Sequence, residues 1–167
     1  RELKNENLWL IIIMGIIENS NLNSQIKKLK ERQKRIVFTN GCFDLLHKGH
    51  IDLLNEASTY GDILIVGLNS DKSVKILKGK DRPIENEKIR SKKLLKIKVV
   101  DFVIIFNSET PKTLINKIMP DVLVKGGDYN KDDVVGSNEV ISSGGKVKIV
   151  PLTKGYSTTS IIKTMER

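Results

Sequence analysis

Short, continuous apolar runs alternate with helix-like segments along most of this chain. Five runs have the composition of buried strands, over residues 36–39, 63–68, 102–106, 122–124 and 147–150. Segments typical of helices lie before, between and after them, over residues 21–33, 50–60, 85–96, 110–118, 134–143 and 158–165. Apolar strands separated by helices predict an α/β fold, with a parallel five-stranded sheet and helices on both faces.

One domain accounts for the length of 167 residues. We expect residues 21–167 to form that domain and residues 1–20 to be an N-terminal extension. The apolar stretch at residues 8–17 is shorter than the roughly 20 residues that span a bilayer, so no membrane segment is expected. Met14 is a candidate start of the protein. Alternatively, this stretch packs on the domain or on a second subunit, which would fit a homodimer.

The net charge of +9 suits a nucleic acid, a membrane surface or a small polyanionic substrate. Aromatic residues make up only 5% of the chain, which leaves little material for stacking bases, so we expect no nucleic-acid or membrane partner. A lysine-rich solvated surface is the simplest interpretation of the charge. Cys42 is the single cysteine, which excludes an internal disulfide and fits a cytoplasmic protein.

Both histidines of the chain, His47 and His50, follow the first predicted strand and open the next helix. Gly49 between them lets the backbone approach a ligand, and a helix N-terminus presents unpaired N–H groups. Two imidazoles there can donate hydrogen bonds to phosphoryl oxygens and stabilise developing charge. In open parallel sheets, ligands bind beyond the carboxyl ends of the strands. The position therefore indicates a phosphate site.

Three other interpretations of the two histidines stay open. They are a metal-binding pair, although no third histidine completes a zinc site, a covalent phosphate carrier, and a locally satisfied helix cap. The position after a strand and the flanking glycines favour phosphate binding.

The run Gly41-x-Phe43-Asp44-x-x-His47-x-Gly49-His50 resembles the signature of the HxGH nucleotidyltransferases. That superfamily includes cytidylyltransferases, FAD synthetases and pantetheine-phosphate adenylyltransferase, and the resemblance implies a Rossmann-like α/β sheet. Residues 155–162 resemble the superfamily's serine- and threonine-rich helix start, which holds the β- and γ-phosphates. An ordinary cluster of helix-capping residues is the alternative.

Within the superfamily, residues 21–167 most resemble the nucleotidyltransferase half of ADP-heptose synthase. The resemblance rests on residues 39–44, 69–71, 77–79, 82–84, 90, 100–103, 123–129, 136–140 and 155–162. It implies transfer of AMP from ATP to D-glycero-β-D-manno-heptose 1-phosphate, for the lipopolysaccharide core. Mg²⁺ would be the cofactor, held mainly by phosphates and not by protein ligands.

Two other kinds of function remain as alternatives to the heptose reaction. One is a glycerol-3-phosphate cytidylyltransferase or an FAD synthetase-like enzyme on the same fold. The other is a non-catalytic, nucleotide-binding regulator. Leu152 stands where cytidylyltransferases carry arginine, which favours ATP over CTP as substrate.

The resemblance also implies roles for individual residues. The catalytic residues would be His47, His50 and Lys78, the last as a mobile cation in a loop flanked by glycine. Asp44 and Asp71 would bind the acceptor substrate. Asp44 could instead orient His47 or a magnesium shell, and either residue could simply cap a turn or helix. The nucleotide would be bound by Asn40, Gly41, Cys42, Phe43, Gly49, Arg90, Lys125, Gly126, Gly127, Asp128, Ser157, Thr158 and Thr159.

Overall fold

The computed structural model describes residues 15–165, and six parallel strands form its sheet. They are β1 (Gly15–Ile16), β2 (Ile36–Gly41), β3 (Ile63–Asn69), β4 (Phe102–Phe106), β5 (Val122–Gly126) and β6 (Lys146–Val150). Their order across the sheet is β1-β4-β3-β2-β5-β6. The α/β class and the parallel sheet predicted from the alternating apolar runs are confirmed.

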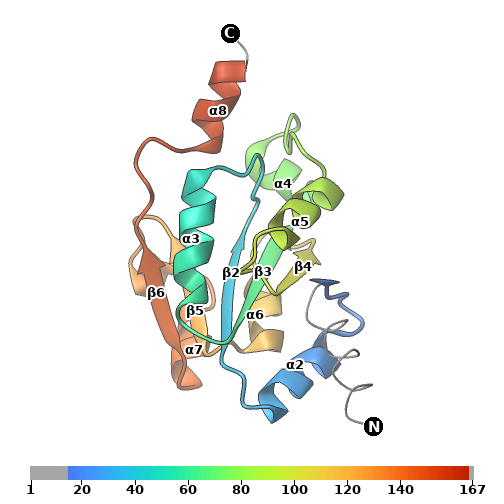
Figure 1. The fold of residues 1–167 in the computed structure, drawn as a ribbon, viewed down its shortest axis with the longest axis vertical. Helices are drawn as coiled ribbons and strands as arrows, with labels where there is room; N and C mark the ends of the chain where they lie inside the picture. Colours follow the sequence, from blue (N-terminus) through green and yellow to red (C-terminus); the bar gives the residue numbers. More distant parts are fainter. Residues whose placement is uncertain (1–14, 166–167) are drawn as a thin grey trace.

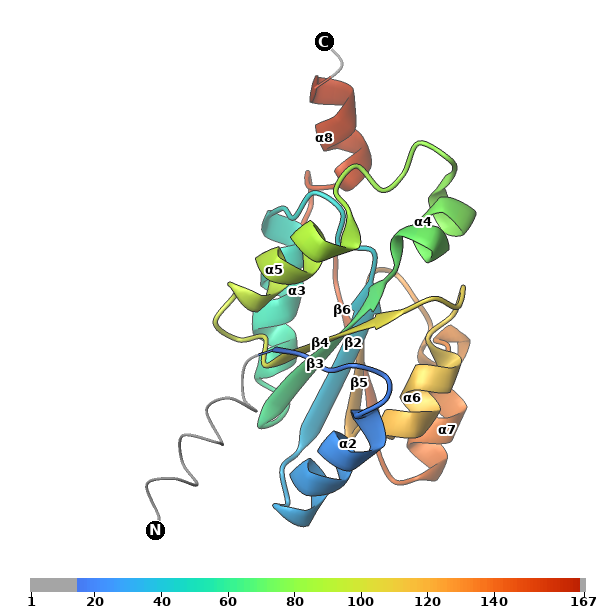
Figure 2. The ribbon, with the colours of Figure 1, turned by 90° about the vertical axis from the view of Figure 1, so that its right-hand side faces the viewer.

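Helices cover both faces of the sheet, which Figure 2 shows close to edge-on. On one face lie α3 (Lys48–Ser58) and α5 (Glu87–Leu95), and on the other α2 (Leu22–Glu31), α6 (Lys112–Ile118) and α7 (Ser137–Ser142). Helix α4 (Asp71–Lys78) follows β3, the 3-10 turn η1 (Lys131–Asp133) precedes α7, and α8 (Thr158–Met165) ends the described chain. Helix α8 stands beyond the carboxyl ends of the strands (Figure 1).

Alternation along the central strands divides the core into two layers. Ile36 and Phe38 pack toward α2 and α6, whereas Val37 packs in a second cluster with Leu54 of α3. All four side chains are fully buried, as expected for a strand whose two faces are both covered by helices.

Strand β1 is the one strand of the sheet that the sequence pattern does not predict. Gly15 and Ile16 pair with Phe102 and Val103 of β4, and the buried Ile17 donates its amide to the Val103 carbonyl at 2.9 Å. Residues 15–17, which the sequence assigns to the N-terminal extension, thus pack with the domain. A two-residue strand is too short for a pattern, because only its partner makes it a strand. Met14 and most of the apolar stretch lie outside the described residues.

The order of the strands reverses at β2. The chain proceeds from β2 to β3 and β4 on one side, and then crosses to β5 and β6 on the other. The carboxyl ends of β2 and β5 therefore flank a topological switch point, where ligands bind in sheets of this kind.

Candidate active site

A cavity of about 600 Å³ lies at the carboxyl ends of the central strands. Its lining comes from the loop after β2, the ends of β3 and β5, the loop after β4, and the start of α8. The residues are Asn40, Gly41, Cys42, Phe43, Asp44, His50, Leu53, Asn69, Leu77, Lys78, Arg82, Glu109, Thr110, Pro111, Lys125, Gly126, Tyr129, Val135, Leu152, Thr158 and Thr159. The cavity therefore lies at the topological switch point between β2 and β5.

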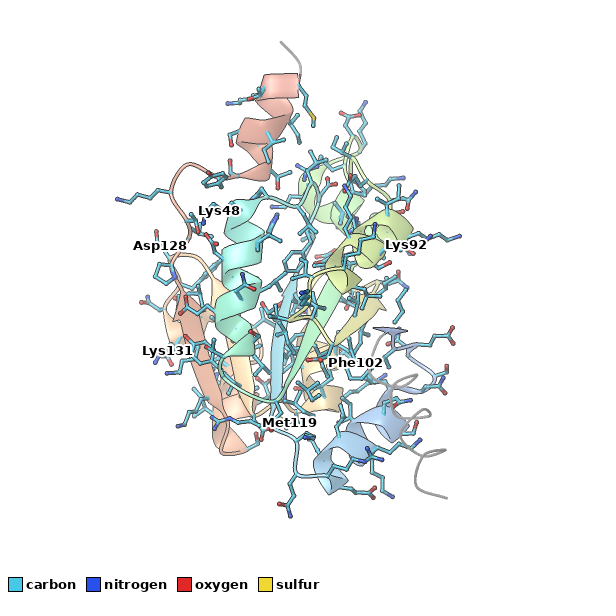
Figure 3. The ribbon with its side chains drawn as sticks, in the orientation of Figure 1. Lys48, Lys92, Phe102, Met119, Asp128 and Lys131 are labelled. Atoms are coloured by element: carbon cyan, nitrogen blue, oxygen red, sulfur yellow. The ribbon has the colours of Figure 1, made fainter. Side chains whose placement is uncertain are left out.

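A second hollow, of about 690 Å³, lies at the opposite end of the molecule, near Met119 in Figure 3. Helices α2, α6 and α7 all end beside it, and Lys30 donates a hydrogen bond to the Met119 carbonyl at 3.2 Å. Cations at helix C-termini stabilise the unpaired carbonyls there. Lys30 therefore has a structural role at this hollow.

The two histidines form a reciprocal cap at the start of α3. The Gly49 amide donates to Nδ1 of His47 at 3.1 Å, and the His47 amide donates to Nδ1 of His50 at 3.3 Å. The two rings stack with their centroids 3.8 Å apart. Since both Nδ1 atoms accept hydrogen bonds, a neutral ring carries its proton on Nε2. The helix cap thus provides two Nε2–H donors.

The surroundings of both rings favour the neutral form in the free protein. Burial lowers the pKa of His47, and burial with the neighbouring His47 lowers the pKa of His50 to about 4, despite the opposing effect of Asp44. A neutral ring donates a hydrogen bond without bringing a full charge. Incoming phosphates favour the protonated form, so ligand binding would raise both pKa values.

We expect His50 to titrate with a midpoint of about 4 in the free protein. The unfolded chain, with a histidine pKa of about 6.5, then binds more protons between these two values, so stability falls as the pH drops from about 6.5 to 4. NMR titration of the imidazole resonances and urea unfolding across this range test both statements. Adding nucleotide should raise the midpoint, and a midpoint near 6.5 without ligand would contradict the expected burial.

The loop between β2 and α3 holds a conformation that side chains seldom adopt. Phe43 and Leu45 have φ angles of +46° and +56°, in the left-handed region. A Cβ atom on Gly49 would lie 3.0 Å from Cε1 of His47, so a larger residue would force the His47 ring to shift. The backbone of this loop is thus shaped around the histidine pair.

Asp44 is buried and already bonded. Its carboxylate accepts from Nε of Arg82 at 2.8 Å, from the Ile84 amide at 2.8 Å and from the Glu85 amide at 3.0 Å. Burial acts to raise the pKa of Asp44, but these hydrogen bonds outweigh it and the pKa lies below its usual value. In this conformation Asp44 fixes the loop that carries Arg82 against the cavity, and it does not offer a free carboxylate to a substrate.

Among the predicted site residues, Arg90 has the surroundings that least fit its implied role of binding the nucleotide. It lies within α5, its side chain is 0% exposed, and it does not line the cavity. Its guanidinium donates to the carbonyls of Glu85, Cys42 and Asn69 and to Oδ1 of Asp71, at 2.7–2.8 Å. Arg90 therefore braces the cavity floor, and its ion-pair partner Asp71 also lies outside the cavity lining.

Two lysines line the cavity without an ion pair to residues 15–165. Lys78 is the last residue of α4 and precedes Gly79, so it ends a helix and does not lie in the predicted loop. Lys125, at the end of β5, lies half-buried 5.8 Å from the Tyr129 ring centroid. Burial lowers the pKa of Lys125. Unpaired cations at strand and helix ends suit a polyanionic ligand.

The segment between β6 and α8 is tied to the histidine loop. Thr153 donates to Asp52 of α3 at 2.8 Å, and Thr158 donates its hydroxyl to the Asp44 carbonyl at 3.0 Å. Ser157 is occupied as a cap of α8, because its Oγ accepts the Ser160 amide at 3.1 Å. Thr158 and Thr159 line the cavity. The helix start at α8 thus faces the same space as His50.

The structure gathers most, but not all, of the predicted residues around one cavity. Gly127 and Asp128 line a neighbouring hollow of about 430 Å³, with Asp128 at the β6 edge of the sheet in Figure 3. Gly127 has a φ of +123°, a conformation that favours glycine. The predicted residues that do not line the cavity itself are His47, Gly49, Asp71, Arg90, Gly127, Asp128 and Ser157.

Several lining residues were missed by the sequence prediction of the site. Arg82 had a signal, since it belongs to a stretch that carries the resemblance, and Leu152 was recognised only as a position where relatives differ. Glu109 and Thr110 follow a strand end, which marks them as candidates in a parallel sheet. Asn69 and Leu77 also belong to stretches that carry the resemblance, whereas Val135 had no such signal.

These features define the class of the protein: an α/β enzyme with a cation-lined cavity and paired histidine donors for phosphate groups. The chain belongs to the cytidylyltransferase-like family, which matches residues 38–164. It is a nucleotidyltransferase.

Curated relatives and solved structures agree with this assignment. The chain is 51% identical over 148 residues to the bifunctional protein HldE of Koribacter versatilis and 54% identical over 138 residues to that of Geotalea uraniireducens. These matches cover 89% and 83% of this chain but only 30% and 28% of the relatives. The chain thus spans less than a third of their length.

Among solved structures, a lipopolysaccharide core biosynthesis protein from Thermoplasma volcanium matches with a TM-score of 0.59 and 30% identity, over 74% of this chain and 99% of that one. A pantoate-beta-alanine ligase from Francisella tularensis matches with a TM-score of 0.56 and 16% identity, over 92% and 77% of the two chains, which indicates a shared fold. Within residues 15–165, no helix has the length and apolar character needed to cross a bilayer.

Proposed function

We propose that the protein transfers AMP from ATP to D-glycero-β-D-manno-heptose 1-phosphate, giving ADP-heptose and pyrophosphate for lipopolysaccharide core synthesis. The name of the Thermoplasma relative and the level of identity to HldE proteins support this choice of pathway. The observation that carries the chemistry is the reciprocal histidine cap, which leaves the Nε2–H of both rings outside the cap, with His50 in a cavity lining that includes lysine and arginine and His47 stacked on it. We place the reaction in the cytoplasm, where ATP is supplied.

The proposed reaction is a direct in-line displacement. A phosphate oxygen of the sugar 1-phosphate forms a bond to the α-phosphorus of ATP, and the bond from that phosphorus to the bridging oxygen of the β-phosphate breaks. Pyrophosphate leaves with the electron pair. No general base is needed, because the attacking oxygen is already an anion, so alignment and fixed positive groups supply the rate.

His47, His50 and Lys78 would stabilise charge as it moves toward the leaving pyrophosphate. Thr158 and Thr159 at the start of α8 would hold the β- and γ-phosphates, because a helix N-terminus offers hydroxyl and amide donors to anions. Mg²⁺ bound with ATP would neutralise part of the phosphate charge. Both carboxylate oxygens of Asp44 are occupied, which fits a metal ion held mainly by phosphates.

The base would lie over β5 and β6, where Lys125, Gly126 and Leu152 line the cavity. A Cβ atom on Gly126 would lie 3.1 Å from Leu53, so glycine lets the Leu53 side chain pack closely on this wall. Leu152 offers no hydrogen bond to a cytosine edge. A site matched to one base leaves polar groups unpaired when another base enters.

We expect kcat/KM for ATP to exceed that for CTP at least tenfold, with heptose 1-phosphate as acceptor. The measurement is pyrophosphate release from ATP and from CTP, each combined with heptose 1-phosphate, glycerol 3-phosphate and FMN. Preference for CTP with glycerol 3-phosphate would replace the heptose assignment and leave the nucleotidyltransferase class intact. ATP binding without release from any combination would favour a regulator.

A further inference from the structure

Glu109 places a negative charge in a cavity whose lining also includes lysine and arginine. Two carboxylates line the cavity, Asp44 and Glu109, and Asp44 is buried and bonded to Arg82 and two amides. Glu109 is exposed and makes no hydrogen bond or ion pair with any part of the chain from residue 15 to 165. The cavity therefore holds one free negative charge among Lys78, Arg82 and Lys125.

The loop that carries Glu109 is held on both sides of it. The buried Asn69, at the end of β3, donates to the Ser73 hydroxyl at 2.8 Å, and that hydroxyl donates to the Ser108 carbonyl at 3.0 Å. The Ser108 hydroxyl in turn donates to the Thr110 carbonyl at 2.8 Å. These contacts tie the loop after β4 to β3 and α4, so the Glu109 backbone has a defined place at the cavity wall.

A free carboxylate beside two bound polyanions is repulsive unless it has a partner. A carboxylate can only accept hydrogen bonds, and hydroxyl groups are the uncharged donors that suit it. Bound phosphates supply no such hydroxyl donors, whereas the ring and side-chain hydroxyl groups of a sugar supply several. The charge therefore fits the sugar part of the acceptor.

The order of the strands gives the sugar a place of its own. The triphosphate donors come from the loop after β2 and from α8, and the base wall comes from β5 and the segment after β6. Glu109 and Thr110 follow β4, which lies on the other side of β3. A sugar phosphate entering over β3 and β4 would approach the α-phosphate from the side opposite the base.

We infer that Glu109 is a specificity-determining residue that accepts hydrogen bonds from the hydroxyl groups of a polyhydroxylated acceptor. This inference rests on the proposed function, since it needs a sugar phosphate as the second substrate. Thr110, adjacent in the lining, supplies a further hydroxyl to the same part of the cavity.

The test is steady-state kinetics of Glu109→Gln, with Asp132→Asn as a control that removes one exposed carboxylate outside the cavity. For Glu109→Gln we expect the KM for heptose 1-phosphate to rise about tenfold, because hydrogen bonds to charged groups are the stronger ones. The KM for ATP should stay within about twofold. With methyl phosphate, a slow acceptor without hydroxyls, the variant and the wild type should not differ, and Asp132→Asn should match the wild type throughout.

A fall in the KM for heptose 1-phosphate in Glu109→Gln would overturn the inference. If Glu109 is only a solvated carboxylate, removing its charge lowers the KM for both anionic substrates. If it holds Mg²⁺, the variant needs more Mg²⁺ and its KM for ATP rises, which also overturns the assignment. A wild-type enzyme that turns over a different hydroxylated acceptor refutes the heptose proposal alone, and the same comparison is then made with that acceptor. A wild type without any turnover overturns both.

Discussion

His50→Ala is expected to lower kcat by about 10²–10³, as is His47→Ala. Each change removes one preorganised Nε2–H donor of the stacked pair that we propose stabilises the developing charge, and the loss of one such donor commonly has this effect. The substitution also removes half of the reciprocal cap at the start of α3. Losing one side of a helix cap costs about 1 kcal/mol, so the folded state should persist in both variants.

The measurement is pyrophosphate release at saturating ATP and acceptor, together with urea unfolding of each variant. His50→Gln keeps an amide donor near the lost Nε2–H and should retain more activity than His50→Ala. Lys92→Ala, on the exposed side of α5 in Figure 3, serves as a control away from the cavity. Near-normal turnover by both alanine variants would remove the phosphate role from this pair.

Arg90→Met is expected to destabilise the fold by about 3–5 kcal/mol, because removing the fully buried guanidinium leaves several acceptors without their hydrogen bonds. Three carbonyls and the Asp71 carboxylate lose their donor in this variant. The carbonyls belong to Cys42, Asn69 and Glu85, which lie at the ends of β2 and β3 and just before α5. The cavity floor should therefore loosen together with the fold.

Urea unfolding of Arg90→Met, Asp71→Asn and Lys92→Met separates these contributions. Asp71→Asn should have a smaller effect, because its side chain is 34% exposed and an amide oxygen can still accept the hydrogen bond. Lys92→Met changes an exposed cation of the same helix and should shift stability by no more than about 0.5 kcal/mol. If Arg90→Met unfolds at the wild-type urea concentration, the guanidinium does not brace the floor.

The sequence alone was sufficient for the class of fold and for the position of the histidine pair after the first central strand. Continuous apolar runs such as Ile63–Asn69 can be buried only between two helical layers, so their alternation with helices predicts the parallel sheet. The histidine pair was predictable for a similar reason. His47, Gly49 and His50 interact within a single helical turn, and such local contacts depend on residue spacing.

The surroundings of the other charged residues and the presence of β1 depended on contacts between distant parts of the chain. Arg90 looked like a phosphate ligand, yet partners 19 to 48 residues away use its donors. The same holds for Asp44, whose carboxylate meets Arg82 only when two loops fold together, and for β1, which needs β4 beside it. An ionised side chain binds a ligand only if no buried partner takes its hydrogen bonds first. Only the tertiary structure decides that competition.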